Sequence, residues 1–174
     1  MTNTPQVSGS ESLGSPQEIG DQAKVYAARM RLQNAIDQAD ALDAIREIAG
    51  NLIGSEEVAV FKVDKKRSEL WLYWSFGVDP NKHAVLDVRR EPKLKLALTG
   101  RKPVFRLALS NENLLSGDDP VNALVPILLD GSASAVIVLF RLFPHKSGIE
   151  VVDREICEVL SHCAGRAVEP YHSR

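Results

Sequence analysis

The chain has 174 residues, 44% of them hydrophobic, and its 21 basic and 23 acidic side chains give a net charge of −2. This length suits one domain with a small appendage, and the near-neutral charge argues against a general nucleic-acid binder, which would be strongly basic. No apolar run approaches the roughly 20 residues that a membrane span needs, and residues 1–20 contain no apolar signal segment. We therefore expect a cytoplasmic protein with no membrane insertion, nucleic acid, metal or cofactor.

The N-terminal part of the chain changes character near residue 20. Residues 1–20 are rich in Ser, Thr, Gly, Pro and Gln and bury too little apolar surface to offset the entropy of ordering them. They are predicted to form a flexible tail, with a docking peptide as the alternative. Residues 21–40 are rich in good helix formers and carry apolar side chains at heptad spacing, which favours packing against a partner helix, or against the chain's own domain.

Residues 41–170 are predicted to form the main domain, followed by a short tail at 171–174. The domain begins with an amphipathic helix from Asp40. Two β-type runs, 58–63 and 69–76, are joined by a polar turn, which predicts an antiparallel hairpin. The second run carries bulky groups on both faces, so we expect both faces of that strand to be covered.

The second half of the domain follows after an irregular middle. A short helix is expected at 93–99 and a short strand at 103–107, because Pro opens each segment. Two further strands are predicted at 122–129 and 133–143, the latter with the composition of a buried strand. A final amphipathic helix is predicted at 152–168.

Four segments resemble, in order, the local pattern of GAF domains, which are sensory modules of signalling proteins. The run from Glu69 to Gly77 is similar to the family's second strand, and Leu98-Thr-Gly-Arg-Lys-Pro-Val104 is similar to its "TGRPV" turn with Lys102 inserted. Asn122-Ala-Leu-Val-Pro-Ile-Leu resembles the strand that ends in "VPL". Asp130-Gly131 resembles the turn of the hairpin that follows.

The resemblance implies an α+β, GAF/PAS-like fold: a central antiparallel β-sheet flanked by helices, with the N- and C-terminal helices on one face. It also implies a pocket on the other face, closed by the irregular middle segment, and a homodimer formed through the first and last helices. The dimer-interface residues expected on this basis are Val25, Ala28, Leu32, Ala35, Ile156 and Leu160.

Charge is distributed unevenly along the chain. Residues 1–64 carry a net charge of −5, residues 65–106 carry +7 and residues 107–174 carry −4. In the GAF interpretation the basic middle segment covers the pocket, where Arg89, Arg90 and Arg106 could attract a phosphate, a carboxylate or an acidic protein surface. A solvated basic surface without a ligand is the alternative.

Other candidate ligand-binding residues lie on the strands. Trp71, Tyr73 and Ser75 alternate along the second strand and are predicted to share a face that could wall a pocket. Plain core packing is the alternative for the two aromatic residues. Asn122 could supply a hydrogen bond to a ligand, or cap the loop before it.

We expect no enzymatic activity. The free methionine sulfoxide reductase of the GAF family uses Cys in its pocket, whereas Cys157 and Cys163 both fall on the final helix and are predicted to be core residues. No Ser-His-Asp or Cys-His set is evident, and His83 stands alone in a loop. The residue set of cyclic-nucleotide-binding members is represented only by Asn81-Lys82.

Two functional hypotheses follow. The first is a non-catalytic regulatory domain that binds a small anionic ligand and relays it through its terminal helices to a downstream signalling protein. The second is a ligand-free scaffold that acts by protein–protein contact and dimerisation, its pocket plugged by Trp71, Tyr73, Trp74 and Phe76. A concave space of roughly 300 Å³ or more would favour the first hypothesis.

Overall fold

A computed structural model describes residues 14–170 of the chain. The four α-helices are α1 (Pro16–Gln33), α2 (Gln38–Glu47), α3 (Pro92–Gly100) and α4 (Val151–Cys163). The six strands are β1 (Val58–Asp64), β2 (Glu69–Phe76), β3 (Val85–Asp87), β4 (Val104–Phe105), β5 (Ala123–Leu129) and β6 (Ser132–Leu139). A π-helix, η1 (Ile48–Ile53), continues α2, and two 3₁₀ turns are η2 (Val88–Arg90) and η3 (Gly165–Ala167).

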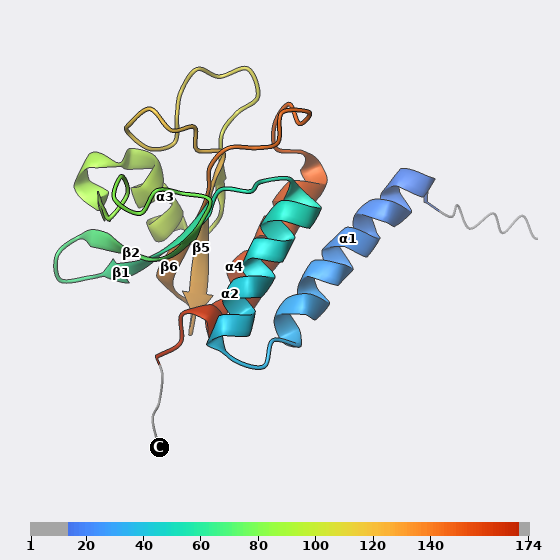
Figure 1. The fold of residues 1–174 in the computed structure, drawn as a ribbon, viewed down its shortest axis with the longest axis horizontal. Helices are drawn as coiled ribbons and strands as arrows, with labels where there is room; N and C mark the ends of the chain where they lie inside the picture. The colour runs from blue at the N-terminus through green and yellow to red at the C-terminus, as the bar shows by residue number, and fades with distance from the viewer. Residues whose placement is uncertain (1–13, 171–174) are drawn as a thin grey trace, which may run out of the picture.

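The strands form one antiparallel sheet in the order β3-β2-β1-β6-β5-β4. Helices α2 and α4 lie on one face of this sheet, here called the helix-bearing face, and α1 packs outside them against α4 (Figure 1). Helix α3 and the irregular segment before β5 cover the other face, here called the α3 face. The predicted α+β class, the antiparallel sheet and the shared side of the terminal helices are therefore confirmed.

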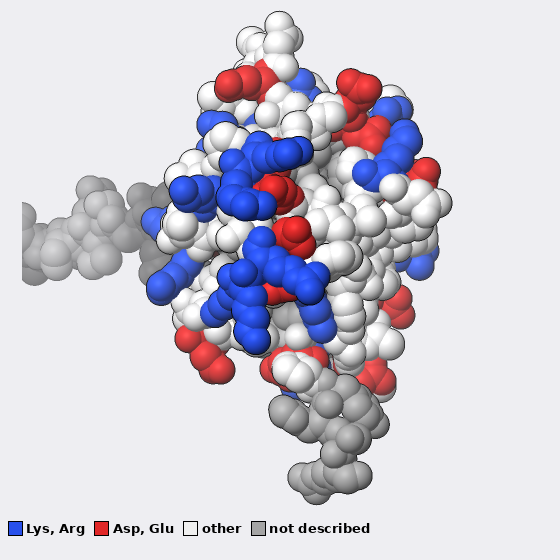
Figure 2. Space-filling model, turned by 90° about the vertical axis from the view of Figure 1, so that its left-hand side faces the viewer, with Lys and Arg blue, Asp and Glu red and all other residues white. Residues whose placement is uncertain are grey.

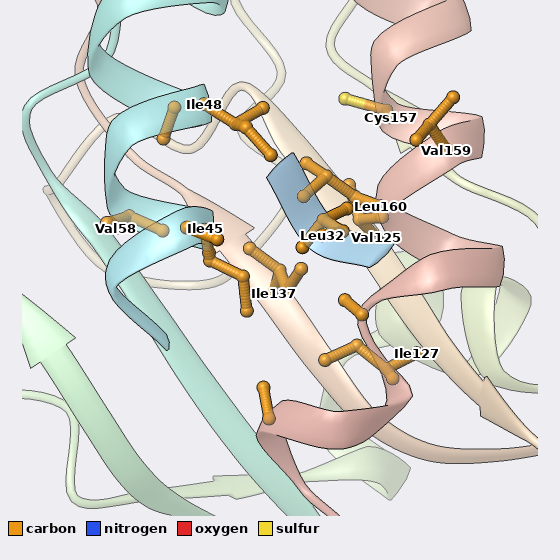
Figure 3. Close-up of a cluster of buried hydrophobic side chains, with 14 of the residues drawn as sticks. Leu32, Ile45, Ile48, Val58, Val125, Ile127, Ile137, Cys157, Val159 and Leu160 are labelled. Carbon is orange, nitrogen blue, oxygen red and sulfur yellow. The ribbon is translucent and has the colours of Figure 1, made fainter. Parts of the chain in front are cut away.

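The core on the helix-bearing face follows from the alternation of side chains along the strands. Successive residues of a strand point to opposite faces, so Val125 and Ile127 of β5 and Ile137 of β6 all meet α2 and α4 (Figure 3). The helices contribute the apolar stripes that their spacing predicts. Helix α2 places Ile45 in this core and α4 places Leu160 there (Figure 3).

Helix α1 begins earlier and ends earlier than its sequence suggests. Ser15 caps it, because the Ser15 hydroxyl accepts from the Glu18 N–H and the Glu18 carboxylate accepts from the Ser15 N–H. Residues 16–20, predicted as flexible tail, are therefore helical, and the rest of the predicted tails at 1–13 and 171–174 lies outside the described residues. The helix stops at Gln33, because the chain turns before Asp37, which caps α2.

Arg31 braces the turn between α1 and α2. Its guanidinium lies 2.8 Å from Asp40 and 2.7 Å from Glu47, and Asp40 also accepts a hydrogen bond of 2.9 Å from the Ile36 N–H. The Arg31 side chain, and then that N–H, hold the pKa of Asp40 below its ordinary value. These contacts of Arg31 and Asp40, here called the α1–α2 bracket, join the two helices across the turn between them.

Strand β2 contains a bulge that the sequence does not reveal. Val60 pairs with Trp74 but Phe61 pairs with Leu72, so Tyr73 is the extra residue. A strict alternation predicts Leu70, Leu72, Trp74 and Phe76 on one face and Trp71, Tyr73 and Ser75 on the other. This prediction is wrong, because the bulge exchanges the two faces halfway along the strand. Leu70, Leu72 and Ser75 are on the α3 face, whereas Trp71, Trp74 and Phe76 are on the helix-bearing face.

Among residues 14–170, no helix is both long enough and apolar enough to cross a membrane.

Candidate functional site

The space between the sheet and α3, where the sequence predicts a pocket, is filled by the protein's own side chains. Phe61, Leu70 and Phe140 approach from the sheet side and Leu94 from α3, and each is at most 1% exposed. The sequence predicts that Trp71, Tyr73, Trp74 and Phe76 fill this space. That prediction is wrong, because the β2 bulge places these aromatic rings on the helix-bearing face. Smaller aromatic and aliphatic groups fill the space instead.

A polar side chain holds the irregular segment over this apolar layer. The Asn113 amide donates a hydrogen bond of 2.6 Å to the Asp119 carbonyl, and its oxygen accepts from the N–H groups of Leu114 and Val121 at 3.0 and 2.8 Å. Leu114 and its neighbour Leu115 are thereby buried beneath the segment. One Asn thus organises a loop whose composition alone predicts no structure.

Glu91, at the start of α3, anchors the same segment from below. Its carboxylate is buried and accepts hydrogen bonds from the Ser116 N–H at 2.9 Å and from the Ser116 hydroxyl. In the sequence, Glu91 is one of few acidic residues in a basic stretch, and this position gives no sign of burial. Its burial is explained by the two donors that Ser116 brings to it.

His83 and Asp119 join the loop after β2 to the loop before β5. The two side chains lie 2.7 Å apart, and the imidazole packs on Phe140 with ring centroids 5.0 Å apart. The hydrogen bond from His83 is the main cause that holds the pKa of Asp119 below its ordinary value. A cavity of about 210 Å³ lies beside this pair, with Lys82 and Arg141 among its lining residues. Sequence reasoning treats His83 as exposed and alone, because the partner lies 36 positions away.

Two of the predicted ligand-binding residues, Arg106 and Asn122, are brought together. Both line a cavity of about 400 Å³ at the β4 edge of the sheet, and the residues around it include no carboxylate. The Arg106 guanidinium donates to the Ser110 carbonyl at 3.1 Å, and the Asn122 amide donates to the Phe140 carbonyl at 2.6 Å. The cavity is separate from the filled space beneath α3.

Arg89 and Arg90 do not join Arg106. Both are exposed at η2, where their guanidinium groups lie 3.1 and 3.9 Å from the Asp87 carboxylate. Figure 2 looks at the side of the molecule where the β1–β2 turn and α3 lie, and shows Lys and Arg in groups with Asp and Glu between them. The basic middle of the sequence is therefore partly neutralised where its side chains meet.

Trp71 and Tyr73 lie on a part of the helix-bearing face that no helix covers. Trp71 is 44% exposed, and Tyr73 and Phe76 are each 39% exposed. Val85 of β3 pairs with Trp71 and extends the same surface. Ser75 faces the opposite way and is not part of it. We call the residues Trp71, Tyr73, Phe76 and Val85 the aromatic strip.

Two cations stand on the rings of the aromatic strip. The Lys62 ammonium lies 3.8 Å from the centroid of Tyr73, and the Arg46 guanidinium lies 4.0 Å from the centroid of Phe76. Arg46 comes from α2 and Lys62 from β1, so the two cations reach the strip from different elements. A cavity of about 380 Å³ opens at its Phe76 end, next to η1.

Most of the residues predicted for a dimer interface pack inside the protomer instead. Five of them are buried in the core of the helix-bearing face, and only Val25 stays partly exposed. The five buried residues are Ala28, Leu32, Ala35, Ile156 and Leu160. A groove of about 580 Å³ runs between α1 and α4, with Val25 and Val159 among its lining residues.

The sequence matches no protein-family model and no curated protein, but solved structures resemble it. The GAF domain of a phosphoenolpyruvate-protein phosphotransferase from Coxiella burnetii superposes with a TM-score of 0.66 at 13% identity, over 85% of this chain and 92% of that domain. The corresponding Acinetobacter domain gives 0.60 at 17% identity, over 91% and 100%. The free methionine-R-sulfoxide reductase from Neisseria meningitidis, solved with its substrate, gives 0.60 at 15% identity, over 89% and 94%.

The chain has the GAF fold. The segments that resemble the GAF pattern form the structures that the resemblance implies. Asp130 and Gly131, both with positive φ, make the turn between β5 and β6. Gly77 ends β2 with φ of 72°, and a Cβ at this position would lie 2.4 Å from the Glu56 carbonyl oxygen, so only glycine fits.

Neither cysteine lies on the α3 face of this GAF fold. Both belong to α4 and to the core of the helix-bearing face. Cys157 is fully buried, and burial, followed by the charge of Asp153, raises the pKa of its thiol far above the ordinary value. A thiol in this environment stays protonated and is a poor nucleophile.

Proposed function

We propose that this chain is a non-catalytic regulatory domain that acts through contacts with proteins, including a second copy of itself. The proposal corresponds to the scaffold hypothesis. The observation that supports it best is the filled space beneath α3, where Phe61, Leu70, Leu94 and Phe140 occupy the volume that a ligand would need. Ligand pockets generally need roughly 300 Å³ or more, and the cavities of that size described above lie elsewhere.

Truncation of one buried residue tests whether the space is part of the core. Leu94→Ala should lower the free energy of unfolding by about 2–5 kcal/mol, the range for a leucine whose removal leaves a cavity. Leu96→Ala is a matched control on the same helix, because Leu96 is exposed, and its effect should be much smaller. Urea unfolding measures both. Equal effects would contradict the interpretation of Leu94 as packed core.

Native mass spectrometry of the purified wild-type protein tests the proposal from the ligand side. We expect peaks for the chain and its dimer without added mass. A small molecule that co-purifies at one equivalent, and that is lost in Leu94→Ala but not in Leu96→Ala, would overturn the proposal and favour a ligand sensor.

Homodimerisation through α1 and α4 is supported by the large exposed surface of α1 and by the groove between the two helices. Only Ala28 and Leu32 of its 18 residues are buried, Tyr26 is 66% exposed, and the helix diverges from the rest of the molecule toward its N-terminal end (Figure 1). A second copy of α1 would cover the groove between α1 and α4. Arg29 on one rim of the groove and Glu158 on the other would then pair between protomers.

Point substitutions test the dimer better than removal of residues 1–39, which would take Ala28, Leu32 and Ala35 out of the core. Val25→Glu places a charge in the groove, whereas Ala27→Glu places the same charge on an exposed site on the other side of α1. Light scattering should give a dimer mass for wild type and Ala27→Glu and a monomer mass for Val25→Glu. A monomeric wild type at all concentrations would contradict the proposal.

A second candidate function is the binding of a small anion at the β4 edge. Arg106 faces a cavity of about 400 Å³ whose lining includes Asn122 and no carboxylate, which suits a phosphate or carboxylate group. Calorimetric titration with inorganic phosphate and with citrate tests it. Binding that weakens at least tenfold in Arg106→Gln, but less than twofold in Lys102→Gln, would support this function. Equal anion binding by both variants would exclude this cavity as the binding site.

A further inference from the structure

We propose that the aromatic strip is a docking surface for an acidic segment of a partner protein, with Lys62 and Arg46 receiving its carboxylates. This inference rests on the proposed function, because it names the surface and the partner chemistry through which a protein-binding domain would act. It concerns a different surface from the groove between α1 and α4, so the two can be tested separately.

The strip is exposed because the helices do not reach this end of the sheet. On the helix-bearing face, residues of β5, β6 and the first part of β1 belong to the core with α2 and α4, whereas β3 and β2 lie at the edge of the sheet. Val85 pairs with Trp71 across the two strands, Tyr73 and Phe76 follow along β2, and all four large apolar groups are in contact with water. Clustered exposed groups of this kind mark interaction sites, and Trp, Tyr and Arg carry a large share of binding energy at protein interfaces.

The two cations are the feature that selects an acidic partner. Among residues 14–170, no carboxylate lies within ion-pair distance of Lys62 or Arg46. Each is held instead over an aromatic ring, Tyr73 for Lys62 and Phe76 for Arg46. Cations that are ordered in advance and lack a counter-ion lose little entropy when a carboxylate binds them.

The surroundings of the strip give the partner a direction. Exposed Lys65, Lys66 and Arg67 lie in the turn next to Lys62. The carboxylates at this end are Asp64, Glu69 and Asp87, of which Asp64 lies 3.9 Å from Arg67 and Asp87 lies 3.1 Å from Arg89. At the other end, the cavity beside η1 is lined by Arg46 together with three carboxylates, those of Asp43, Glu47 and Glu56. The acidic part of a bound segment therefore lies toward the β1–β2 turn, and its carboxylates reach Lys62 before the cavity.

The same geometry disfavours single-stranded nucleic acid, which also binds aromatic sheet faces by stacking its bases. The rings of Tyr73 and Phe76 already carry Lys62 and Arg46 on one face, so a base would have to displace a cation before it could stack. The chain as a whole has a net charge of −2. An acidic peptide can use both cations where they stand.

A random dodecapeptide display library, selected on the wild-type protein with Trp71→Ala as the counter-selection protein, tests the inference without a known partner. Selected peptides are then synthesised and titrated by fluorescence anisotropy. We expect them to be rich in Asp and Glu with at least one large apolar residue, and to bind more weakly as salt concentration rises. Lys62→Glu should weaken peptide binding at least tenfold. Lys102→Glu, which makes the same charge reversal outside the strip, should weaken it less than twofold.

Several outcomes would overturn the inference: no enriched peptides, peptides with neutral or positive net charge, equal binding by Lys62→Glu and Lys102→Glu, or tighter binding of a dT20 oligonucleotide than of any peptide. Circular dichroism of each variant should match that of the wild type, since Trp71 and Lys62 are partly exposed. If the peptides fail while the wild type still dimerises in a Val25-dependent way, the strip is wrong and the proposed function stands. If both fail, the proposed function fails as well.

Discussion

The helix-bearing face of the sheet has two halves that differ in composition and in exposure. Where α2 and α4 cover it, the residues are aliphatic, such as Val125, Ile127 and Ile137, and each is fully buried. Where the helices end, the strip residues are mainly aromatic and stay about two-fifths exposed. Branched aliphatic side chains fit an interior packed by helices, whereas aromatic rings with cations above them tolerate water and can bind a second surface. One face of one sheet thus serves as core and as candidate interface.

The largest expected effect lies in the covered half. Ile137→Ala should lower the free energy of unfolding by about 4 kcal/mol, within the range for a fully buried isoleucine. Chemical denaturation measures it. A loss similar to that of Trp71→Ala would remove the distinction between the two halves.

A buried ion pair sharpens the comparison. Lys146 lies 2.6 Å from Asp153 in α4, and Asp153 is fully buried with its Oδ1 atom unpartnered within the described residues. Asp153→Asn should cost about 3 kcal/mol, because it leaves the charge of Lys146 without a partner. Asp87→Asn, which breaks an exposed pair with Arg89, should change stability far less. If the two substitutions cost the same, burial does not govern these pairs.

Acid should weaken the α1–α2 bracket. The pKa of Asp40 is lowered from an ordinary value of 3.8 by Arg31, so the carboxylate stabilises the folded state fully above about pH 5, and this contribution is lost as pH falls through the lowered pKa. Asp40→Asn should therefore destabilise the protein at pH 7 and have less effect at pH 2–3. Asp43→Asn on the same helix is the control. Unfolding curves at both pH values measure the loss of stability in Asp40→Asn. A loss that is as large at pH 2–3 as at pH 7 would contradict the role of Asp40 in the bracket.

The smallest effect on stability is expected in the open half. Trp71→Ala should cost clearly less than Ile137→Ala, because 44% of the residue is already in water. The same denaturation series measures it. A cost near that of Ile137→Ala would show that the strip is core rather than an interface.

The order of elements could be predicted from the sequence because local signals carry it. The period of apolar residues separates the helices from the strands, and Gly77 and the Asp130-Gly131 pair mark two turns that the structure contains. The bulge at Tyr73 could not be predicted, because it depends on the register of Val60 and Phe61 in another strand. It places Trp71 and Trp74 on the same face of the sheet, where strict alternation predicts opposite faces.

The candidate site was predicted less well than the fold. Arg106 and Asn122 were identified and do meet at one cavity, since their segments are neighbours in the sheet. His83 was interpreted as standing alone in a loop, and no role was predicted for Asp119 or Glu91, because their partners are brought near only by the folded loops. Side-chain pairing across long sequence distances leaves no periodic signal.

Lys146 ties together parts of the chain that are far apart in sequence. Its ammonium group donates to the Ile53 carbonyl at the end of η1 and pairs with Asp153 in the first turn of α4. The end of η1 and the beginning of α4 are thus joined at one point, where Ile53 and Lys146 line a separate cavity of about 330 Å³. One lysine thus joins the helical layer before β1 to the helix that lines the groove between α1 and α4.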